Sequence, residues 1–296
     1  MPTWDKVLEE VDKLNPLTYL KDCLDKLYQS TGRTTICYMS AFSVIKPSVP
    51  PPFHSIIDQD IQGFMTCVQG TDKSALDLII HTPGGDYEAT KRIINYVHQT
   101  FPHIRVIIPH LAMSGGTLIA CAADEIWMGP YSSIGPTDPQ FFLKEGYVPV
   151  QAIIDEFNIA FDEVSKNPAK ALLWNERLKQ IPFGRLNAAI VMQDNSTKYL
   201  VDLLAKRNCR NKTPQERTEI ANFLNRHEKH SSHGQGIFIN DLQGRLNVTN
   251  LHDDKNFEDQ VLTIYHSATI LFQRTTAQKI IINHLGRSHI NNYSPN

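Results

Sequence analysis

The sequence predicts an α/β fold in which crossover helices cover a largely parallel sheet and a helical region follows. Short β-branched and apolar runs alternate with amphipathic segments between residues 33 and 150. This alternation is typical of parallel strands joined by right-handed crossovers. Helical spacing of apolar residues prevails after Pro149. The chain has 296 residues, of which 41% are hydrophobic and 20% charged, enough for a sizeable buried core.

The N-terminal half supplies most of the predicted sheet. Residues 4–29 place apolar side chains among charges at helical spacing, and Pro16 divides them into two short helices. A proline-rich loop at 46–53 follows the first strand. Strands are predicted at 33–42, 76–82, 104–109 and 125–128. Helices are predicted at 57–68, 87–101 and 117–123.

The C-terminal half is predicted to be mainly helical. Thr213, Pro214 and Glu216 mark one helix start, because Thr caps it, Pro takes the first helical position and Glu closes a capping box. Helices are predicted at 153–164, 169–179, 186–204, 213–227 and 257–272. A last strand is predicted at 279–282 and a frayed tail at 288–296.

Composition argues against several classes of function. Lys and Arg number 29 against 31 Asp and Glu, and no stretch concentrates one sign, so we expect no nucleic-acid partner. The five cysteines are scattered without paired spacing, which indicates free thiols in a reducing compartment. No run approaches the ~20 apolar residues that a membrane span needs. We therefore expect a cytoplasmic protein without a membrane span.

Ser114 is the first candidate for chemistry, since it stands between a predicted strand and a helix that begins on Gly115 and Gly116. A serine hydroxyl needs a base to act as a nucleophile, and the positive end of a helix favours the reaction. The motif is half of a G-x-S-x-G elbow, because Ala112 occupies the first glycine position. Taken alone, the pattern favours a serine that only caps a structural helix.

Pro83-Gly84-Gly85 lies at the carboxyl end of the neighbouring predicted strand, where α/β sheets bind ligands. A glycine pair there can direct backbone N–H groups into the crevice. With the N–H of Gly115, which follows the serine, such a group would form an oxyanion hole. The alternative is a tight turn that needs a positive φ.

Four segments in combination resemble the serine dehydrogenase proteinase family of Clp-fold serine peptidases: HTPGGD, AMSGGT, AADEIWM and SSIGPTDPQ. That family is related to the Clp protease subunit, to signal peptide peptidase A and to the crotonases. The resemblance is close over residues 76–141 and returns near 225–250. It implies a Clp/crotonase-like fold and serine endopeptidase activity, with no metal or organic cofactor.

The resemblance also implies a Ser-Asp-His triad. Ser114 matches the nucleophile of the family, Asp138 matches the acid in GPTDPQ, and His233 matches the base. The sequence departs from the family around His233, where glycines replace the common acidic and proline residues. Gly84, Gly85 and Gly115 complete the expected site as its oxyanion hole.

The residues themselves leave other bases open. His227, His230 and His233 are spaced as a metal site could be, but no Cys or acid cluster completes one, and a solvated helix end accounts for the first two. His110, four residues before Ser114, is a rival base, although a structural hydrogen bond explains it as well. Asp138 could equally belong to a turn.

Three other functions remain open on the sequence. A Ser-Lys dyad could use Lys144, Lys166 or Lys170, although none lies in a matching segment. A non-catalytic scaffold or binding module would need Ser114 only as a helix cap. Acyl-CoA chemistry of the crotonase type would share the oxyanion hole and would not require the serine.

The expected organisation has three parts: a helical N-terminal arm at 1–32, a Clp/crotonase-like serine peptidase domain at 33–250, and a C-terminal helix and tail at 251–296 that pack on the core. Relatives of this fold assemble into rings or dimers. The resemblance therefore implies a homo-oligomer that acts on a peptide or protein substrate.

Overall fold

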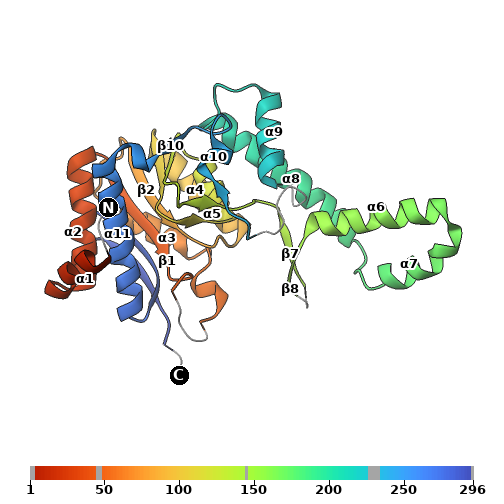
Figure 1. Ribbon diagram of the computed structural model, residues 1–296, viewed down its shortest axis with the longest axis horizontal. Coiled ribbons are helices and arrows are strands. Elements are labelled where there is room, and N and C mark those ends of the chain that lie inside the picture. Colours follow the sequence, from red (N-terminus) through yellow and green to blue (C-terminus); the bar gives the residue numbers. More distant parts are fainter. Residues whose placement is uncertain (1–3, 45–48, 144–145, 226–233, 295–296) are drawn as a thin grey trace.

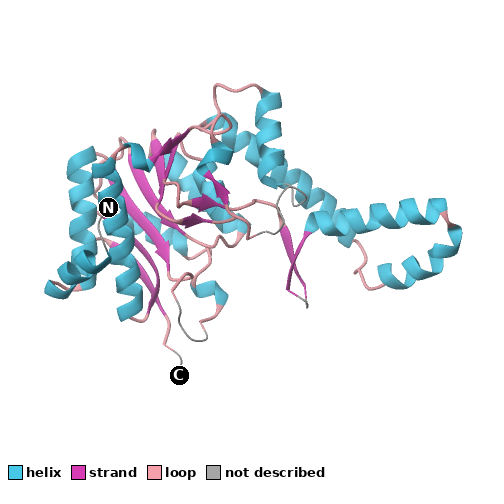
Figure 2. Ribbon diagram, viewed as in Figure 1, coloured by secondary structure: helices cyan, strands magenta, loops and turns pink. Residues whose placement is uncertain are grey.

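A seven-stranded sheet organises the computed structural model, which describes residues 4–44, 49–143, 146–225 and 234–294 (Figures 1 and 2). Its strand order is β10-β5-β3-β2-β1-β11-β12. The first five strands in this order run parallel, whereas β11 and β12 each pair antiparallel with their neighbour. The strands are β1 (Thr34–Ser40), β2 (Leu76–His81), β3 (Ile104–Ile108), β5 (Glu125–Met128), β10 (Val248–Asn250), β11 (Ala277–Asn283) and β12 (Ser288–Asn292).

Helices cover both faces of this sheet, so its central strands are buried throughout. Ile36 and Tyr38 of β1 pack in the core beneath one helical layer, while Cys37 and Met39 point into the other core. One layer contains α2 (Pro16–Thr31) and α11 (Lys255–Arg274), with α1 (Trp4–Lys13) beside them. The other contains α3 (Asp60–Val68), α4 (Tyr87–Thr100) and α5 (Gly115–Cys121).

A second, three-stranded sheet joins segments that are far apart in the sequence. β6 (Ser133–Ile134) pairs parallel with β4 (Leu111–Ala112) and antiparallel with β9 (Ile237–Phe238). The short helix α10 (Ile239–Leu242) follows β9 directly. This small sheet brings the chain after β3 next to the chain that leads into α10.

A helical arm projects from the body of the molecule (Figure 1). It begins after the hairpin of β7 (Gln140–Leu143) and β8 (Gly146–Pro149). We define the helical arm as residues 150–195, which comprise α6 (Val150–Lys166), η2 (Pro168–Lys170), α7 (Ala171–Leu178) and the first half of α8 (Arg185–Lys206). The remaining described elements are η1 (Pro51–Phe53), α9 (Pro214–Asn225) and η4 (Leu251–Asp253).

The predicted strands and helices are confirmed to within a few residues at each end, and so is the capping box at Thr213. The prediction of a frayed tail is wrong over Ser288–Asn292, because these residues form β12. Their polar side chains hid the strand, which lies at the sheet edge and is held by backbone pairing with β11. All five cysteines are free and buried. No helix in the described part of the chain is long and apolar enough to cross a membrane.

Candidate active site

Ser114 has a strained backbone. Its φ is 51° and its ψ −110°, and among the described residues it is the one non-glycine residue with a positive φ. Such a conformation costs on the order of 1–3 kcal/mol and persists only where the surroundings enforce it. Ser114 occupies the N-cap position of α5, yet its side chain makes no capping hydrogen bond. The geometry is therefore that of a sharp strand-to-helix elbow and not of an ordinary cap.

The elbow is enforced by pairing between the end of β2 and β4. Thr82 N–H donates to the Leu111 carbonyl at 3.0 Å, and Met113 N–H donates to the Thr82 carbonyl at 3.0 Å. On the other side of the serine, Gly116 N–H donates to the Met113 carbonyl at 2.8 Å. The chain thus turns within three residues, with Ser114 at the turn.

Gly84 gives the serine room. A methyl group built on Gly84 would lie 2.7 Å from Ser114 Cβ and 2.9 Å from the Gly115 nitrogen, so only glycine fits there. Its φ of 90° favours glycine as well. The N–H of Gly84 donates to the Thr82 hydroxyl at 3.2 Å. This residue therefore provides the close approach, and its own N–H is already engaged.

The N–H groups of Gly85 and Gly115 are the donors that remain. Neither has a hydrogen-bond acceptor in the described part of the chain. A methyl group on Gly115 would come within 3.6 Å of the Gly85 nitrogen, so the two N–H groups lie close together. Two neighbouring backbone donors beside a serine are the components of an oxyanion hole.

Asp138 is buried, with 3% of its surface exposed. The loop before it is tied to α5, because the Thr117 hydroxyl donates to the Gly135 carbonyl at 2.7 Å and accepts from the Gly135 N–H at 3.0 Å. Gln140 Nε2 donates to the Asp138 carboxylate at 3.5 Å. The same polar contacts that fix α5 behind Ser114 therefore also fix the approach to Asp138.

His233 lies outside the described residues, as do His227 and His230. The chain on either side of them is anchored next to Asp138. On the N-terminal side of these histidines, the carbonyl of Leu224 in α9 accepts from the Thr137 N–H at 2.9 Å. On their C-terminal side, Ile237 of β9 pairs with Ile134 of β6.

His110 has the structural role that the sequence left open. Its Nδ1 is 3.0 Å from the Tyr265 hydroxyl of α11, and its ring stacks on His81 with centroids 5.5 Å apart. Burial lowers the pKa of His110. The ring is thus held toward the α11 layer.

The lysines of the alternative dyad are separated from the serine or undescribed. Lys170 Nζ pairs with Glu163 at 3.1 Å, and Lys166 ends α6, both toward the far end of the helical arm (Figure 1). Lys144 lies outside the described residues. No group of three metal-ligating side chains occurs within the described ranges.

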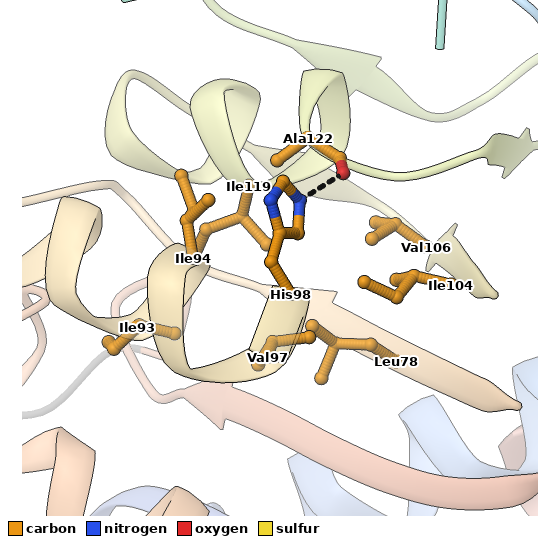
Figure 3. A pocket seen from close by; sticks show the side chains of 9 residues that line it. All are labelled: Leu78, Ile93, Ile94, Val97, His98, Ile104, Val106, Ile119 and Ala122. Atoms are coloured by element: carbon orange, nitrogen blue, oxygen red, sulfur yellow. Dashed lines mark hydrogen bonds between the residues drawn. The ribbon is translucent and has the colours of Figure 1, made fainter. Parts of the chain in front are cut away.

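Figure 3 shows a small pocket between α4, α5 and the sheet. Its volume is about 10 Å³, room for a single water at most, and its lining is apolar apart from His98. His98 Nε2 is 2.7 Å from the Ala122 carbonyl, so its polar edge is satisfied. This cavity is a packing gap and not a substrate site.

Several residues of the site were not predicted from the sequence. Thr82 holds the Gly84 N–H, Thr117 holds the Asp138 loop, and Ile56 pairs with the chain around Gly85. Threonine and isoleucine at these positions look like ordinary strand and helix residues. No spacing signal marks them, because their partners are distant in the sequence.

The strained serine, the glycine crevice and the sheet order together define an α/β protein with a Clp-like fold. Residues 21–165 match the family model of the ClpP-like SDH-type serine proteinases. This match confirms the resemblance of the motifs to that family over residues 21–165.

Two relatives come from Methanocaldococcus jannaschii and are named uncharacterized proteins MJ0137 and MJ1495. The first is 40% identical over 105 residues, which are 35% of this chain and 35% of the relative. The second is 33% identical over 144 residues, or 48% of each chain. The match thus spans at most about half the length of these relatives.

A solved structure, a mutant of the 1510-N membrane-bound stomatin-specific protease, superposes with a TM-score of 0.42 at 15% identity. The superposition covers 66% of this chain and 74% of that one.

Proposed function

We propose that the chain is a serine endopeptidase that hydrolyses peptide bonds through Ser114, Asp138 and His233. The observation that carries this proposal is the strained Ser114 beside two backbone donors that have no acceptor among the described residues. A helix cap would need neither the strain nor the room that Gly84 leaves. The match of residues 21–165 to the family model of the ClpP-like SDH-type serine proteinases supports the same class of reaction.

The proposed reaction follows the acyl-enzyme course. His233 takes the proton of Ser114 as the serine oxygen attacks the peptide carbonyl. The N–H groups of Gly85 and Gly115 donate to the resulting oxyanion. His233 then gives the proton to the leaving amine, and a water hydrolyses the acyl-enzyme by the same route. Asp138 orients the imidazole and stabilises its charged form.

Chain connectivity supports His233 as the base. Three residues separate it from Ile237, whose strand pairs with the segment that leads to Asp138. On the other side of the histidines, the described chain ends at Asn225, next to Leu224, whose carbonyl accepts from the Thr137 N–H. Both flanks of the histidine segment are therefore fixed beside the proposed acid.

The partners and the location are part of the proposal. We expect a peptide or protein substrate, no cofactor and a homo-oligomer. The helical arm, with apolar side chains facing solvent, offers a surface for assembly. Free, buried cysteines suit a reducing, cytoplasmic compartment.

Cleavage of a denatured protein substrate by single-residue variants tests the reaction. Ser114→Ala should lower the rate by a factor approaching ~10⁶, and His233→Ala by a comparable factor. Lys144→Ala and Ser30→Ala, with Ser30 in α2 far from the elbow, should cleave at the wild-type rate. Loss of cleavage in Lys144→Ala with retention in His233→Ala would assign the base to the lysine. A wild-type chain that turns over acyl thioesters and no peptide would contradict the proposal.

A further inference from the structure

A buried ionic network joins three elements of the sheet layer next to the glycine crevice. Lys279 of β11 lies 2.8 Å from Asp60 Oδ1, at the first residue of α3. The hydroxyl of Tyr38 in β1 donates to Asp60 Oδ2 at 2.6 Å. Lys279 is 2% exposed and Asp60 is fully buried, so both charges are shielded from water.

The network holds a short piece of chain from both sides. Lys279 Nζ donates to the carbonyl of Ser55 at 2.7 Å. Asp60 Oδ2 accepts from the N–H of Ile57 at 3.0 Å. Ile56 stands between these two attachments, so its position is set by the ion pair.

Ile56 in turn forms backbone hydrogen bonds with the residues on both sides of Gly85. Its N–H donates to the Gly84 carbonyl at 2.7 Å, and its carbonyl accepts from the Asp86 N–H at 2.9 Å. A methyl group on Gly85 would lie 2.3 Å from the Ile56 nitrogen, so the two backbones are in direct contact. The Ile56 Cδ1 atom would also come within 3.2 Å of a methyl group on Gly115.

A gain in folding stability does not sufficiently explain why Lys279 and Asp60 form an ion pair here. Burying two charges carries a desolvation penalty that their attraction often fails to exceed, and apolar side chains of the same volume are commonly as stable. Burial lowers the pKa of Lys279, and the nearby Asp60 carboxylate opposes that effect. What the pair supplies beyond packing is a fixed geometry for Ser55 and Ile57.

We propose that Tyr38, Asp60 and Lys279 are positioning residues for the oxyanion hole, acting through Ile56 on the N–H of Gly85. None of them touches the substrate. This inference rests on the proposed peptidase function, in which Gly85 donates to the oxyanion. An oxyanion-hole donor acts only when it is aimed at the developing charge, and loss of one costs about 10²–10³ in rate. A displaced donor should therefore reduce kcat and leave substrate affinity nearly unchanged.

Two variants test the network with purified full-length protein. Lys279→Met removes the cation, and the double variant Asp60→Asn with Lys279→Met removes both charges, so that no charge is left buried alone. We expect the double variant to unfold near the wild-type urea concentration. Its kcat on a peptide substrate should fall by about 10- to 100-fold, within the range of a partly misplaced donor. A peptide aldehyde, whose carbonyl carbon adds the Ser114 oxygen to give a tetrahedral adduct with its former carbonyl oxygen in the oxyanion hole, should bind weaker by the same factor, while KM stays nearly unchanged.

Asp77→Asn is the matched control. Asp77 is an equally buried carboxylate at the start of β2, paired with Arg33 and Arg105, at the opposite end of the strand from Gly84. This variant should unfold at a lower urea concentration and keep the wild-type kcat. An unchanged kcat in the double variant, with an active wild type, would overturn the inference and leave the proposed peptidase standing. A wild type without peptidase activity would overturn the proposed function and this inference together.

Discussion

At the scale of single residues, the site is decided by where a side chain is absent. Gly84, Gly85 and Gly115 each lie where a methyl group would collide with backbone or a threonine hydroxyl. The sequence could predict a crevice at Pro83-Gly84-Gly85, because glycine pairs at strand ends are visible in one dimension. It could not separate the two roles, in which Gly84 gives room and Gly85 offers a donor. That distinction depends on Thr82, which accepts from one of the two N–H groups.

Gly84→Ala should abolish most activity by crowding Ser114. The added methyl group would meet Ser114 Cβ and the Met113 carbonyl, both at 2.7 Å, and the elbow would have to shift. We expect a fall in kcat/KM of at least about 10²-fold, since the nucleophile and its donors move together. The rate of peptide cleavage measures it.

Gly244→Ala is the control for this substitution. Gly244 has a similarly positive φ of 76°, with no atom within 4 Å of the added methyl group. It should lose about 1 kcal/mol of unfolding free energy and retain full activity. Equal loss of activity in both variants would show that backbone strain alone, and not contact with Ser114, is responsible.

At the scale of elements, the helical arm stands apart from the packed layers. The part of the arm next to the β7–β8 hairpin is buried against that hairpin through Val150, Ile153 and Ala189. Farther out, large apolar side chains are exposed, among them Phe161 at 74% and Leu172 at 75%. The sequence predicted these helices from their spacing. It could not predict that they project, because an apolar face looks the same whether it packs on its own core or on another chain.

The double substitution Phe161→Asp with Leu172→Asp should dissociate the proposed homo-oligomer. Charges buried in an apolar interface without partners disfavour association strongly. We expect light scattering at micromolar concentration to give an assembly for the wild type and a smaller species for the variant. Leu14→Asp, at an exposed site outside the arm, should assemble like the wild type. A monomeric wild type, or a variant that assembles normally, would rule out the arm as the interface.

At the scale of the whole molecule, the fold brings together segments that the sequence holds far apart. β9 meets the segment before Asp138 through a short strand pairing with β6, and the end of α9 meets it through a backbone hydrogen bond from Thr137 to Leu224. The parallel core was predictable over β1, β2, β3 and β5, because these strands are rich in apolar and β-branched residues. The parallel edge strand β10 was not, because Val248-Thr249-Asn250 is short and mostly polar. The β6 and β9 pairing was not, since two-residue strands leave no periodicity. The edge strand β12 was missed for the related reason that its side chains are polar.

Stability should fall in acid because of His81. This ring is buried at the end of β2, where its Nε2 is 2.9 Å from the Ser43 hydroxyl, it stacks on His110, and Tyr265 of α11 lies edge-on to it. Burial, with a smaller contribution from His110, lowers the pKa of His81 from 6.5 to about 3. The unfolded chain therefore binds a proton below pH 6.5 that the folded chain does not. The stabilising contribution is complete above that pH and is lost as the pH falls toward 3.

Loss of this contribution between pH 7 and pH 5 should lower the unfolding free energy by about 2 kcal/mol. Urea unfolding at the two pH values measures it. His81→Asn keeps an acceptor near the Leu111 N–H and cannot titrate, so its acid-dependent loss should be smaller by that amount. Identical losses in the wild type and the variant would assign the acid sensitivity to other groups.

The central claim is that Ser114 is an activated nucleophile, and a fluorophosphonate probe tests it most directly. We expect mass spectrometry of the labelled, digested wild type to find one adduct, on the peptide that contains Ser114. The adduct should vanish in Ser114→Ala and form far more slowly in His233→Ala. A wild-type chain that stays unlabelled, or that carries the adduct on another serine, would contradict the account.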